Sequence, residues 1–392
     1  MVGRRVIVVV VALVLAFGPT RAAPAAEGVP PGWTEVAREV LAPGAEHVVL
    51  RRSGPDQEVH VARLAPGSPL RLVPVLAGDR LGTLERTTSM CARVACVAAV
   101  NGDFWGSDQR PIGAAVSGGE LVTTPAIEHI HLTVGGDGRA TFRHGFDWSA
   151  AVSTLSGYRL AVAAVNRPLG DGVNLYSRRW GPTTGTPAGT AEVTVELLLP
   201  SPSALPTGGT TVRVVSAGSG GNSPIGPNQV VVAGRGAAAT AVGALVSGAV
   251  LGLATLHVDV GGVQGAMGGS PLLLSGGRLD FPADNPDSFT QDRHARTVVG
   301  ATATGDVLLV TVDDNGTSAG MSLRDTAALM TALGAVHAMN LDGGGSTTFV
   351  SGGTVRNSPP GGERPVVSAL ALTPTTTGPL DGLLGPLLGP RN

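Results

Sequence analysis

Short runs of β-branched and aliphatic residues, separated by Gly, Pro, Asn and Asp, make up most of this chain as far as Leu372. Runs of this kind are typical of strands, and the residues between them favour turns and hairpins. One segment differs, because its apolar residues recur at helical spacing between Ser322 and Leu333, and Ser322 and Asp325 match a capping box. The pattern therefore predicts a strand-rich mixed domain of the α+β class with a few helices, of which this one is the clearest.

The N-terminal end has the pattern of a secretory signal peptide. Arg4 and Arg5 precede an apolar run over 6–17, and small residues follow as far as Ala26. The run is too short to span a bilayer, which takes roughly 20 residues, and a small-x-small cleavage site follows it. We therefore expect residues 1–25 to be a signal peptide and the protein to be secreted or extracytoplasmic. An uncleaved anchor is the alternative interpretation.

The remaining sequence divides into three stretches. Residues 26–47 are interpreted as a linker and N-terminal lead-in, 48–373 as the working domain, and 374–392, rich in Thr, Pro, Gly and Leu, as a flexible tail. A chain of this length suits one domain or two, and we expect one, because strand-rich chains of this size often build one. No other segment is apolar and long enough to span a membrane, so we expect no stable insertion after signal cleavage. With a formal net charge of −2, nothing indicates a nucleic-acid partner.

The two cysteines, Cys91 and Cys96, are five residues apart. In an exported chain we expect them to form a disulfide. Such a small loop restricts the unfolded chain less than a long loop does, so its effect is local, on the turn just before Asn101. A zinc site is not expected here, because no second cysteine pair or His-rich spacing accompanies the two.

Several carboxylates close apolar strand-like runs and are followed at once by glycine or a polar turn. These residues are Asp103, Asp259, Asp313 and Asp342. Each alone is more typical of a turn residue that bonds its own backbone, but four together favour a cleft, because reactive groups commonly lie where strands lead into loops. The chain contains no lysine, so an anionic substrate has to be held by arginine, by backbone N–H groups or by a metal.

The stretch 340–348, Asn-Leu-Asp-Gly-Gly-Gly-Ser-Thr-Thr, is the most informative one. Asn340 and Asp342 alternate with apolar neighbours, so strand geometry puts both side chains on one face. Three consecutive glycines let N–H groups approach an anion, which favours an anion-binding nest, and a tight hairpin is the other interpretation. The stretch is not a P-loop, since the lysine is absent, and Ser346 lacks the Gly-x-Ser-x-Gly frame of a nucleophile elbow.

Three blocks of this sequence resemble those of the phosphodiester glycosidase family. They are 340–350, 295–300 (Ala-Arg-Thr-Val-Val-Gly), and Val312-Asp313 leading to 320–323 (Gly-Met-Ser-Leu). Weaker agreement extends through 101–105, 268–273 and 357–366. The blocks occur in the family's order and together cover roughly residues 48 to 372, so the resemblance implies the family's fold over nearly the whole mature chain.

The resemblance implies a hydrolase that cleaves a sugar-1-phosphodiester at the anomeric carbon and releases free sugar. For an exported chain, we expect the substrate among the phosphoglycosides of the cell envelope or of exopolysaccharides. A departing phosphate carries negative charge, so arginines and N–H groups can supply much of the stabilisation that an acid supplies in ordinary glycosidases. A carboxylate then attacks the anomeric carbon or activates water, and the sequence leaves open which carboxylate is nucleophile or base, and whether configuration is retained or inverted.

The residues that match the family's blocks give the candidate site. The expected catalytic carboxylates are Asp342 first, then Asp313 and Glu363, and below them Asp103. The expected substrate contacts are Asn101 and Asn340 for sugar hydroxyls, Arg296 and Arg364 for phosphate, Thr297 beside Arg296, and the N–H groups of Gly343, Gly344, Gly345 and Ser346. Trp105 is the favoured platform for sugar stacking.

Other interpretations remain open. Asp314 and Ala319 depart from the family's usual pattern, which leaves room for a glycan-binding or polysaccharide-assembly protein with the same fold and no turnover. A phosphodiesterase that attacks phosphorus would release sugar phosphate instead of free sugar. His129 and His131 lie on one face of a strand but lack a third recognisable ligand, so we expect no metal and no cofactor.

Overall fold

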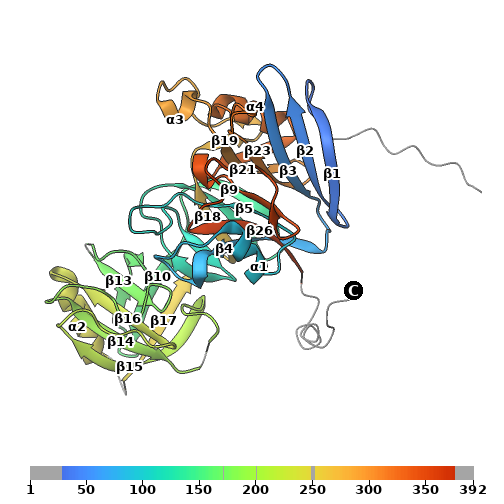
Figure 1. Cartoon of the computed structure of the whole chain (residues 1–392). Helices are drawn as coiled ribbons and strands as arrows, with labels where there is room; N and C mark the ends of the chain where they lie inside the picture. Colours follow the sequence, from blue (N-terminus) through green and yellow to red (C-terminus); the bar gives the residue numbers. More distant parts are fainter. Residues whose placement is uncertain (1–28, 171, 200, 249–251, 376–392) are drawn as a thin grey trace, which may run out of the picture.

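The structure, a computed structural model, describes residues 29–170, 172–199, 201–248 and 252–375. The expected signal peptide and nearly all of the expected tail lie outside the described residues. Within them, strands arranged in four sheets dominate and helices are few (Figure 1), in agreement with the predicted strand-rich class. None of the helices described is long and apolar enough to cross a membrane.

One large sheet, called here the β1–β20 sheet, joins the start of the described chain to its C-terminal third. In spatial order its strands are β1 (Thr34–Ala42), β2 (Ala45–Arg52), β3 (Gln57–Leu64), β22 (Val307–Val312), β21 (Arg296–Thr302), β23 (Ala335–Asn340), β19 (Leu272–Ser275) and β20 (Arg278–Leu279). All residues of β22 are buried. This sheet is therefore covered on both faces near its centre.

Two five-stranded sheets pack against one face of the β1–β20 sheet. The first contains β7 (Glu120–Thr123), β6 (Ala115–Ser117), β18 (Val263–Gly269), β8 (Ile130–Gly135) and β9 (Ala140–His144). The second contains β25 (Thr354–Val355), β24 (Phe349–Ser351), β5 (Ala98–Asn101), β26 (Ser368–Pro374) and β4 (Leu70–Leu76). Leu309 of the large sheet shares a core with Leu132 of the first small sheet and Leu370 of the second. The free energy of this burial holds the three sheets together.

Helix α4 (Leu323–Ala332) covers the opposite face of the β1–β20 sheet, where Met330 packs against Val310. The Ser322 side chain caps its N-terminus by accepting a hydrogen bond from the Asp325 N–H group. This helix lies where the apolar spacing predicts one. The chain turns out of it at Gly334, whose φ of 90° suits glycine.

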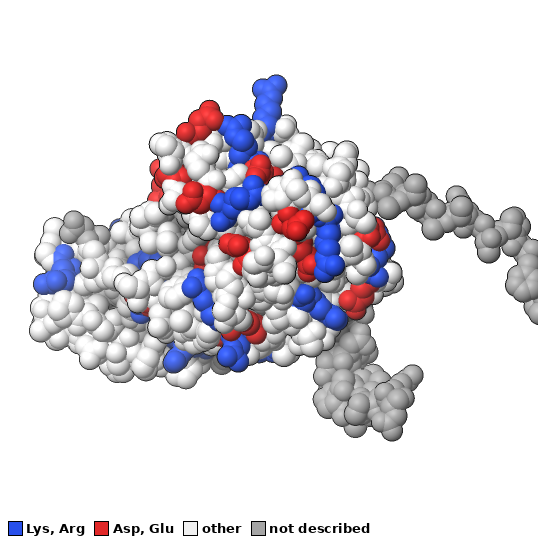
Figure 2. All heavy atoms as spheres, turned by 45° about the horizontal axis from the view of Figure 1, so that its top comes forward, with Lys and Arg blue, Asp and Glu red and all other residues white. Residues whose placement is uncertain are grey.

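A separate lobe is built by the second eight-stranded sheet (Figure 1). Its strands, in spatial order, are β11 (Arg159–Ala161), β10 (Ser149–Thr154), β17 (Leu253–Asp259), β15 (Gly208–Gly218), β14 (Ala191–Leu197), β16 (Gln229–Gly234), β13 (Val173–Ser177) and β12 (Ala164–Val165). Helix α2 (Ala237–Gly248) packs on it, and Val242 and Leu245 enter the core. On the face shown in Figure 2, charged residues are few on this lobe and numerous elsewhere. The charged groups on that face thus lie mainly outside the lobe.

The N-terminal lead-in differs from expectation. Residues 34–47 form β1 and the start of β2 instead of a linker. Most side chains of β1 are exposed, and Glu35, Arg38 and Glu46 form ion pairs on its surface. An edge strand with one covered side needs few apolar residues, so its sequence lacks the apolar pattern of the other strands.

The predicted disulfide between Cys91 and Cys96 is present. Cys91 lies in the last turns of α1 (Thr87–Arg93), and Cys96 directly precedes the residues that lead into β5. The Cys96 N–H group also donates to the Cys91 carbonyl at 2.9 Å. The bond therefore fixes the path from α1 into the strand that ends at Asn101, as the spacing predicts.

Candidate functional site

Asn101 joins four segments where strands of two sheets end. Its Oδ1 accepts hydrogen bonds from Thr297 Oγ1 at 2.7 Å and from the Thr348 N–H group at 3.0 Å. Its Nδ2 donates to the Asp342 carbonyl at 2.6 Å. Asn101 is fully buried, so its amide positions the backbone on either side of the glycine run. The structure does not leave this side chain free for a sugar hydroxyl.

Asp342, Ser346 and Arg364 form one connected group. The Ser346 hydroxyl donates to Asp342 Oδ2 at 2.5 Å. The same hydroxyl accepts from Arg364 Nε at 2.9 Å and from Arg364 Nη2 at 2.5 Å, and this Nη2 lies 3.7 Å from Asp342 Oδ2. The structure thus brings together the first-ranked carboxylate and one of the two arginines predicted to bind phosphate.

Burial raises the pKa of the Asp342 carboxyl, and the negative charge of Asp103 adds to this. The Ser346 hydroxyl, Arg364 and the Gly343 N–H group act in the opposite direction, because each favours the ionised form. The net pKa lies above the ordinary value of 3.8. A carboxyl poised in this way can exchange a proton more readily near neutral pH than an exposed aspartate can.

An open hollow lies in front of this group. It has a volume of about 270 Å³ and is lined by Phe104, Trp105, Gly106, Ser107, Asp342 and Arg364. The side chain of Arg364 is 48% exposed, whereas that of Asp342 is 15% exposed. The hollow therefore presents a carboxylate, a guanidinium and aromatic rings to solvent together, which suits an anionic sugar. Of the four lining residues in 104–107, the sequence predicted a substrate contact for Trp105 alone.

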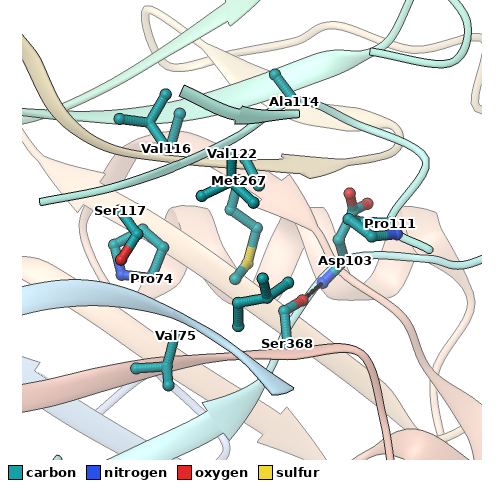
Figure 3. Close-up of a pocket in the computed structure, with 13 residues that line it drawn as sticks. Pro74, Val75, Asp103, Pro111, Ala114, Val116, Ser117, Val122, Met267 and Ser368 are labelled. Atoms are coloured by element: carbon teal, nitrogen blue, oxygen red, sulfur yellow. Dashed lines mark hydrogen bonds between the residues drawn. The ribbon is translucent and has the colours of Figure 1, made fainter. Parts of the chain in front are cut away.

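Asp103 is 2% exposed and is not among the residues that line the hollow. Its Oδ2 accepts from the Gly113 N–H group at 2.8 Å, and its own N–H group donates to Ser368 Oγ at 3.0 Å (Figure 3). Its Oδ1 is 3.5 Å from Nε2 of His129, and neither of these two buried atoms has a hydrogen-bond partner among the described residues. The apolar pocket beside Asp103 in Figure 3 measures about 20 Å³, too small for a sugar.

His129 was missed as the partner of Asp103. The sequence pairs it with His131 on one strand face, yet His131 has other partners: its Nε2 accepts from the Ala114 N–H group at 2.8 Å and its Nδ1 lies 2.9 Å from the Gly145 carbonyl. Burial lowers the pKa of His131 to about 4. His129 lies just before β8, and its proximity to an aspartate 26 positions away has no signal in a single sequence.

Arg296 is not brought into the hollow. It is 2% exposed, and its guanidinium donates to the carbonyls of Met321, Phe289 and Asp292 at 2.8 to 3.0 Å. Burial lowers its pKa to about 10. All three contacts join segments around α3 (Ser288–Gln291) and the start of α4, so this arginine holds the loops together.

Asp313 and Glu363 also lie outside the residues that line the hollow. Asp313 is buried, and its carboxylate accepts from Asn357 Nδ2 and from the Ser358 N–H group, both at 3.0 Å. Burial raises its pKa. Glu363 accepts from both the N–H group and the hydroxyl of Thr88 at 2.8 Å, which caps the first turn of α1.

The glycine run forms a tight turn, η3 (Gly344–Ser346). A side chain on Gly343 would come within 2.8 Å of the Ala295 carbonyl, and Gly344 has a φ of 55°. The N–H groups of Gly344 and Ser346 donate to the carbonyls of Ala295 and Gly343. The glycines therefore let the turn pack against the residue that precedes β21, and two of the four N–H groups expected to bind an anion donate to backbone carbonyls instead.

Two further candidates lie beside the run. Thr297 is buried and donates to Asn101. Asn340 is buried, and its Nδ2 donates to the Ser270 carbonyl at 2.8 Å. Both side chains are therefore engaged in buried hydrogen bonds next to the turn and do not line the hollow.

Comparison with known proteins finds a family match over part of the chain and a shared fold over most of it. The model of the phosphodiester glycosidase family matches residues 204–373, which include Asp342, Ser346 and Arg364. The N-acetylglucosamine-1-phosphodiester alpha-N-acetylglucosaminidase of Bos taurus is 42% identical over 65 residues, which are 17% of this chain and 12% of the bovine protein. This chain thus matches a small part of that relative's length.

Two solved structures share the fold more widely. A hypothetical protein from Synechocystis superposes with a TM-score of 0.64 at 23% identity, over 84% of this chain and 61% of its own. A Burkholderia pseudomallei structure, described as that of an exported protein, gives a TM-score of 0.61 at 25% identity, over 81% of this chain and 74% of its own. These two likenesses concern the fold. The family resemblance in the sequence is confirmed for residues 204–373, which match the phosphodiester glycosidase model.

Proposed function

We propose that this chain is an extracytoplasmic glycoside hydrolase that cleaves a sugar-1-phosphodiester at the anomeric carbon and releases free sugar. The observation that carries the proposal is that Asp342 and Arg364 line the same open hollow. The family match over 204–373 and the printed activity of the bovine relative support this choice of reaction. The basic, apolar and small-residue pattern of 1–25 supports an extracytoplasmic location.

In this proposal Arg364 binds the phosphate. Its guanidinium is about half exposed at the hollow and is held by two hydrogen bonds to the Ser346 hydroxyl. As charge grows on the departing phosphate, a fixed guanidinium stabilises the transition state more than the ground state. The chain has no lysine that could take this role.

Asp342 acts at the anomeric carbon. The Ser346 hydroxyl donates to its Oδ2, and this hydrogen bond fixes the orientation of the carboxylate at the edge of the hollow. Trp105 offers an aromatic face for the sugar ring. We expect the natural substrate among phosphate-linked glycans of the cell envelope or of exopolysaccharides.

The test is hydrolysis of a synthetic sugar-1-phosphodiester in water labelled with heavy oxygen. The proposal requires the label on the released sugar, and loss of release in Asp342→Asn. The matched control is Asp259→Asn, since Asp259 is an exposed strand-ending aspartate whose side chain bonds the N–H group of Gly261. Label on phosphate would instead indicate a phosphodiesterase, and saturable binding without turnover would indicate a glycan-binding protein.

A further inference from the structure

A second cluster of charged side chains lies on the β1–β20 sheet, apart from the hollow. Glu58 and His60 share one face of β3, and Asp313 directly follows the neighbouring strand β22. The Asp313 N–H group donates to the Glu58 carbonyl at 3.0 Å, which fixes the two segments together. Each of the three side chains offers one atom, and these atoms all lie within 4.8 Å of one another.

His60 points an unpaired nitrogen into this cluster. The residue is 3% exposed, and its Nε2 has no hydrogen-bond partner among the described residues, although Glu58 Oε1 lies 3.4 Å away. Directly across the strand pair, the buried hydroxyl of Thr311 also lacks a partner within the described part of the chain. Buried polar atoms are rarely left unpaired, so each such atom calls for a ligand or an explanation.

The other ring nitrogen of His60 is already held. Its Nδ1 lies 3.1 Å from Nε2 of His47, the two imidazole rings stack on each other, and the His47 ring stacks on Phe349. A hydrogen bond at Nδ1 that fixes the ring is usual for a metal-binding histidine.

The two carboxylates keep oxygens available. Glu58 Oε2 accepts from Arg51 Nε at 2.6 Å, and Oε1 faces His60. Asp313 accepts one hydrogen bond at each oxygen, from Asn357 and from Ser358, and a carboxylate oxygen has a second lone pair. The set therefore presents one imidazole and two carboxylates, and the two carboxylates together balance the charge of a divalent cation.

We propose that Glu58, His60 and Asp313 bind one divalent first-row transition-metal ion of the zinc or manganese type. A single imidazole combined with carboxylate oxygens suits these ions better than calcium, which prefers oxygen ligands throughout. None of the three residues lines the hollow, so this site is separate from the proposed chemistry.

The ion would stabilise the loop that supports the glycine turn. Asn357, which donates to Asp313, also donates to the Thr347 carbonyl at 3.1 Å and accepts from the Phe349 N–H group at 2.7 Å. Asp313 is thus the shared point between the cluster and the strand that follows η3. A bound cation would fix this carboxylate and raise the stability of the folded protein by mass action.

Calorimetric titration of chelator-treated protein without a histidine tag tests the site, with ZnCl2 and MnCl2 as titrants. We expect about one equivalent of either ion to bind and the melting temperature to rise. Glu58→Gln keeps the shape of a partly exposed side chain, and we expect it to weaken binding at least about tenfold. His60→Gln is the second variant, and it is expected to do the same.

The matched control is His144→Gln. His144 pairs with Asp280 at 2.8 Å on the surface, and no third metal-ligating side chain joins this pair among the described residues. We expect this variant to bind the ion like the wild-type protein. Absence of saturable binding at micromolar metal, or unchanged binding in both Glu58→Gln and His60→Gln, would overturn the proposal. Sugar release in the labelling experiment tests the proposed hydrolase independently.

Discussion

Burial of the Asp342 carboxylate raises its pKa by more than its hydrogen bonds and Arg364 lower it. Because burial raises its pKa, the protonated form is favoured in the folded state. The protonated Asp342 carboxyl therefore contributes to the stability of the folded protein at pH values below 3.8, the pKa of the unfolded state. This contribution is lost as the pH rises through the higher pKa of the folded state. Groups at functional sites commonly reduce stability in this way.

We therefore predict that Asp342→Asn raises the melting temperature at pH 7 and lowers sugar release on the order of a thousandfold or more. At pH 3.5 the wild-type carboxyl is largely protonated, so the two proteins should melt at similar temperatures. Thermal denaturation at both pH values, together with the sugar assay, measures this. A variant that melts below the wild type at pH 7 would mean that the charged carboxylate stabilises the fold.

Arg364 holds its place through two N–H groups on one hydroxyl, which only a guanidinium can supply in this geometry. We predict that Arg364→Lys raises KM for the sugar phosphodiester about tenfold and lowers kcat as well, because the substituted ammonium is less firmly placed. Initial-rate kinetics separate the two effects. Arg293→Lys is the control, since Arg293 pairs with Asp325 at an exposed position. Equal kinetics for Arg364→Lys and the wild type would remove Arg364 from phosphate binding.

The sequence predicted Asp342, Arg364 and Trp105 as site residues because each stands beside glycine or in a matched block, and all three line the hollow. It could not place Arg296, because strand geometry sends neighbouring side chains to opposite faces. Thr297 points to Asn101 on the inner side, so Arg296 points the other way, toward Met321. A sequence block shows that residues are close in the chain, but the direction of each side chain depends on which face the sheet buries.

At the scale of elements, helix α1 depends on a carboxylate from a distant segment. Glu363 bonds both the N–H group and the hydroxyl of Thr88 in its first turn, and Arg86, the residue before the helix, supplies no side-chain cap. We predict that Glu363→Ala lowers the free energy of unfolding by about 1 to 2 kcal/mol and leaves kcat within about twofold. Denaturant unfolding and the sugar assay measure the two quantities. A large loss of kcat with unchanged stability would instead place Glu363 in catalysis.

The strands were the most predictable elements, because β-branched runs between glycines and prolines carry a local signal. β22 is an example: its six residues are all apolar or threonine and all are buried. The charged β1 was not predictable from apolar spacing, since most of its side chains face water. Sheet order was also beyond the sequence, because β3 pairs with β22 across more than 240 positions.

For the whole molecule, the lobe supports the loop that lines the hollow. Arg167, which follows β12 of the lobe, donates to the carbonyls of Pro111, Ile112 and Gly113 at 2.8 to 3.2 Å. Its Nε donates to the Thr124 carbonyl at 2.5 Å. Burial lowers its pKa to about 10. The carbonyls of Pro111, Ile112 and Gly113 belong to the segment that continues from Trp105, so Arg167 links the lobe to the loop that lines the hollow.

A second contact joins the same two parts. The Arg110 guanidinium lies over the ring of Trp180, 3.9 Å from its centroid. Trp180 follows β13 of the lobe, and Arg110 lies in the loop between Trp105 and Arg167's partner carbonyls. Arg110 and Arg167 thus both connect the lobe to one loop. This loop carries Phe104 and Trp105, so we expect the position of these two rings in the hollow to depend on the lobe.

We therefore predict that Arg167→Met, which cannot donate hydrogen bonds, lowers the free energy of unfolding by about 3 kcal/mol, because buried carbonyls lose their partners. It should also lower kcat/KM about tenfold, mainly through KM, since the loop that carries Trp105 becomes less ordered without any change to Asp342 or Arg364. Arg178→Met is the control, because Arg178 donates to the Pro202 and Pro227 carbonyls within the lobe. If Arg167→Met loses stability but keeps its KM, the lobe stabilises the fold without shaping the hollow.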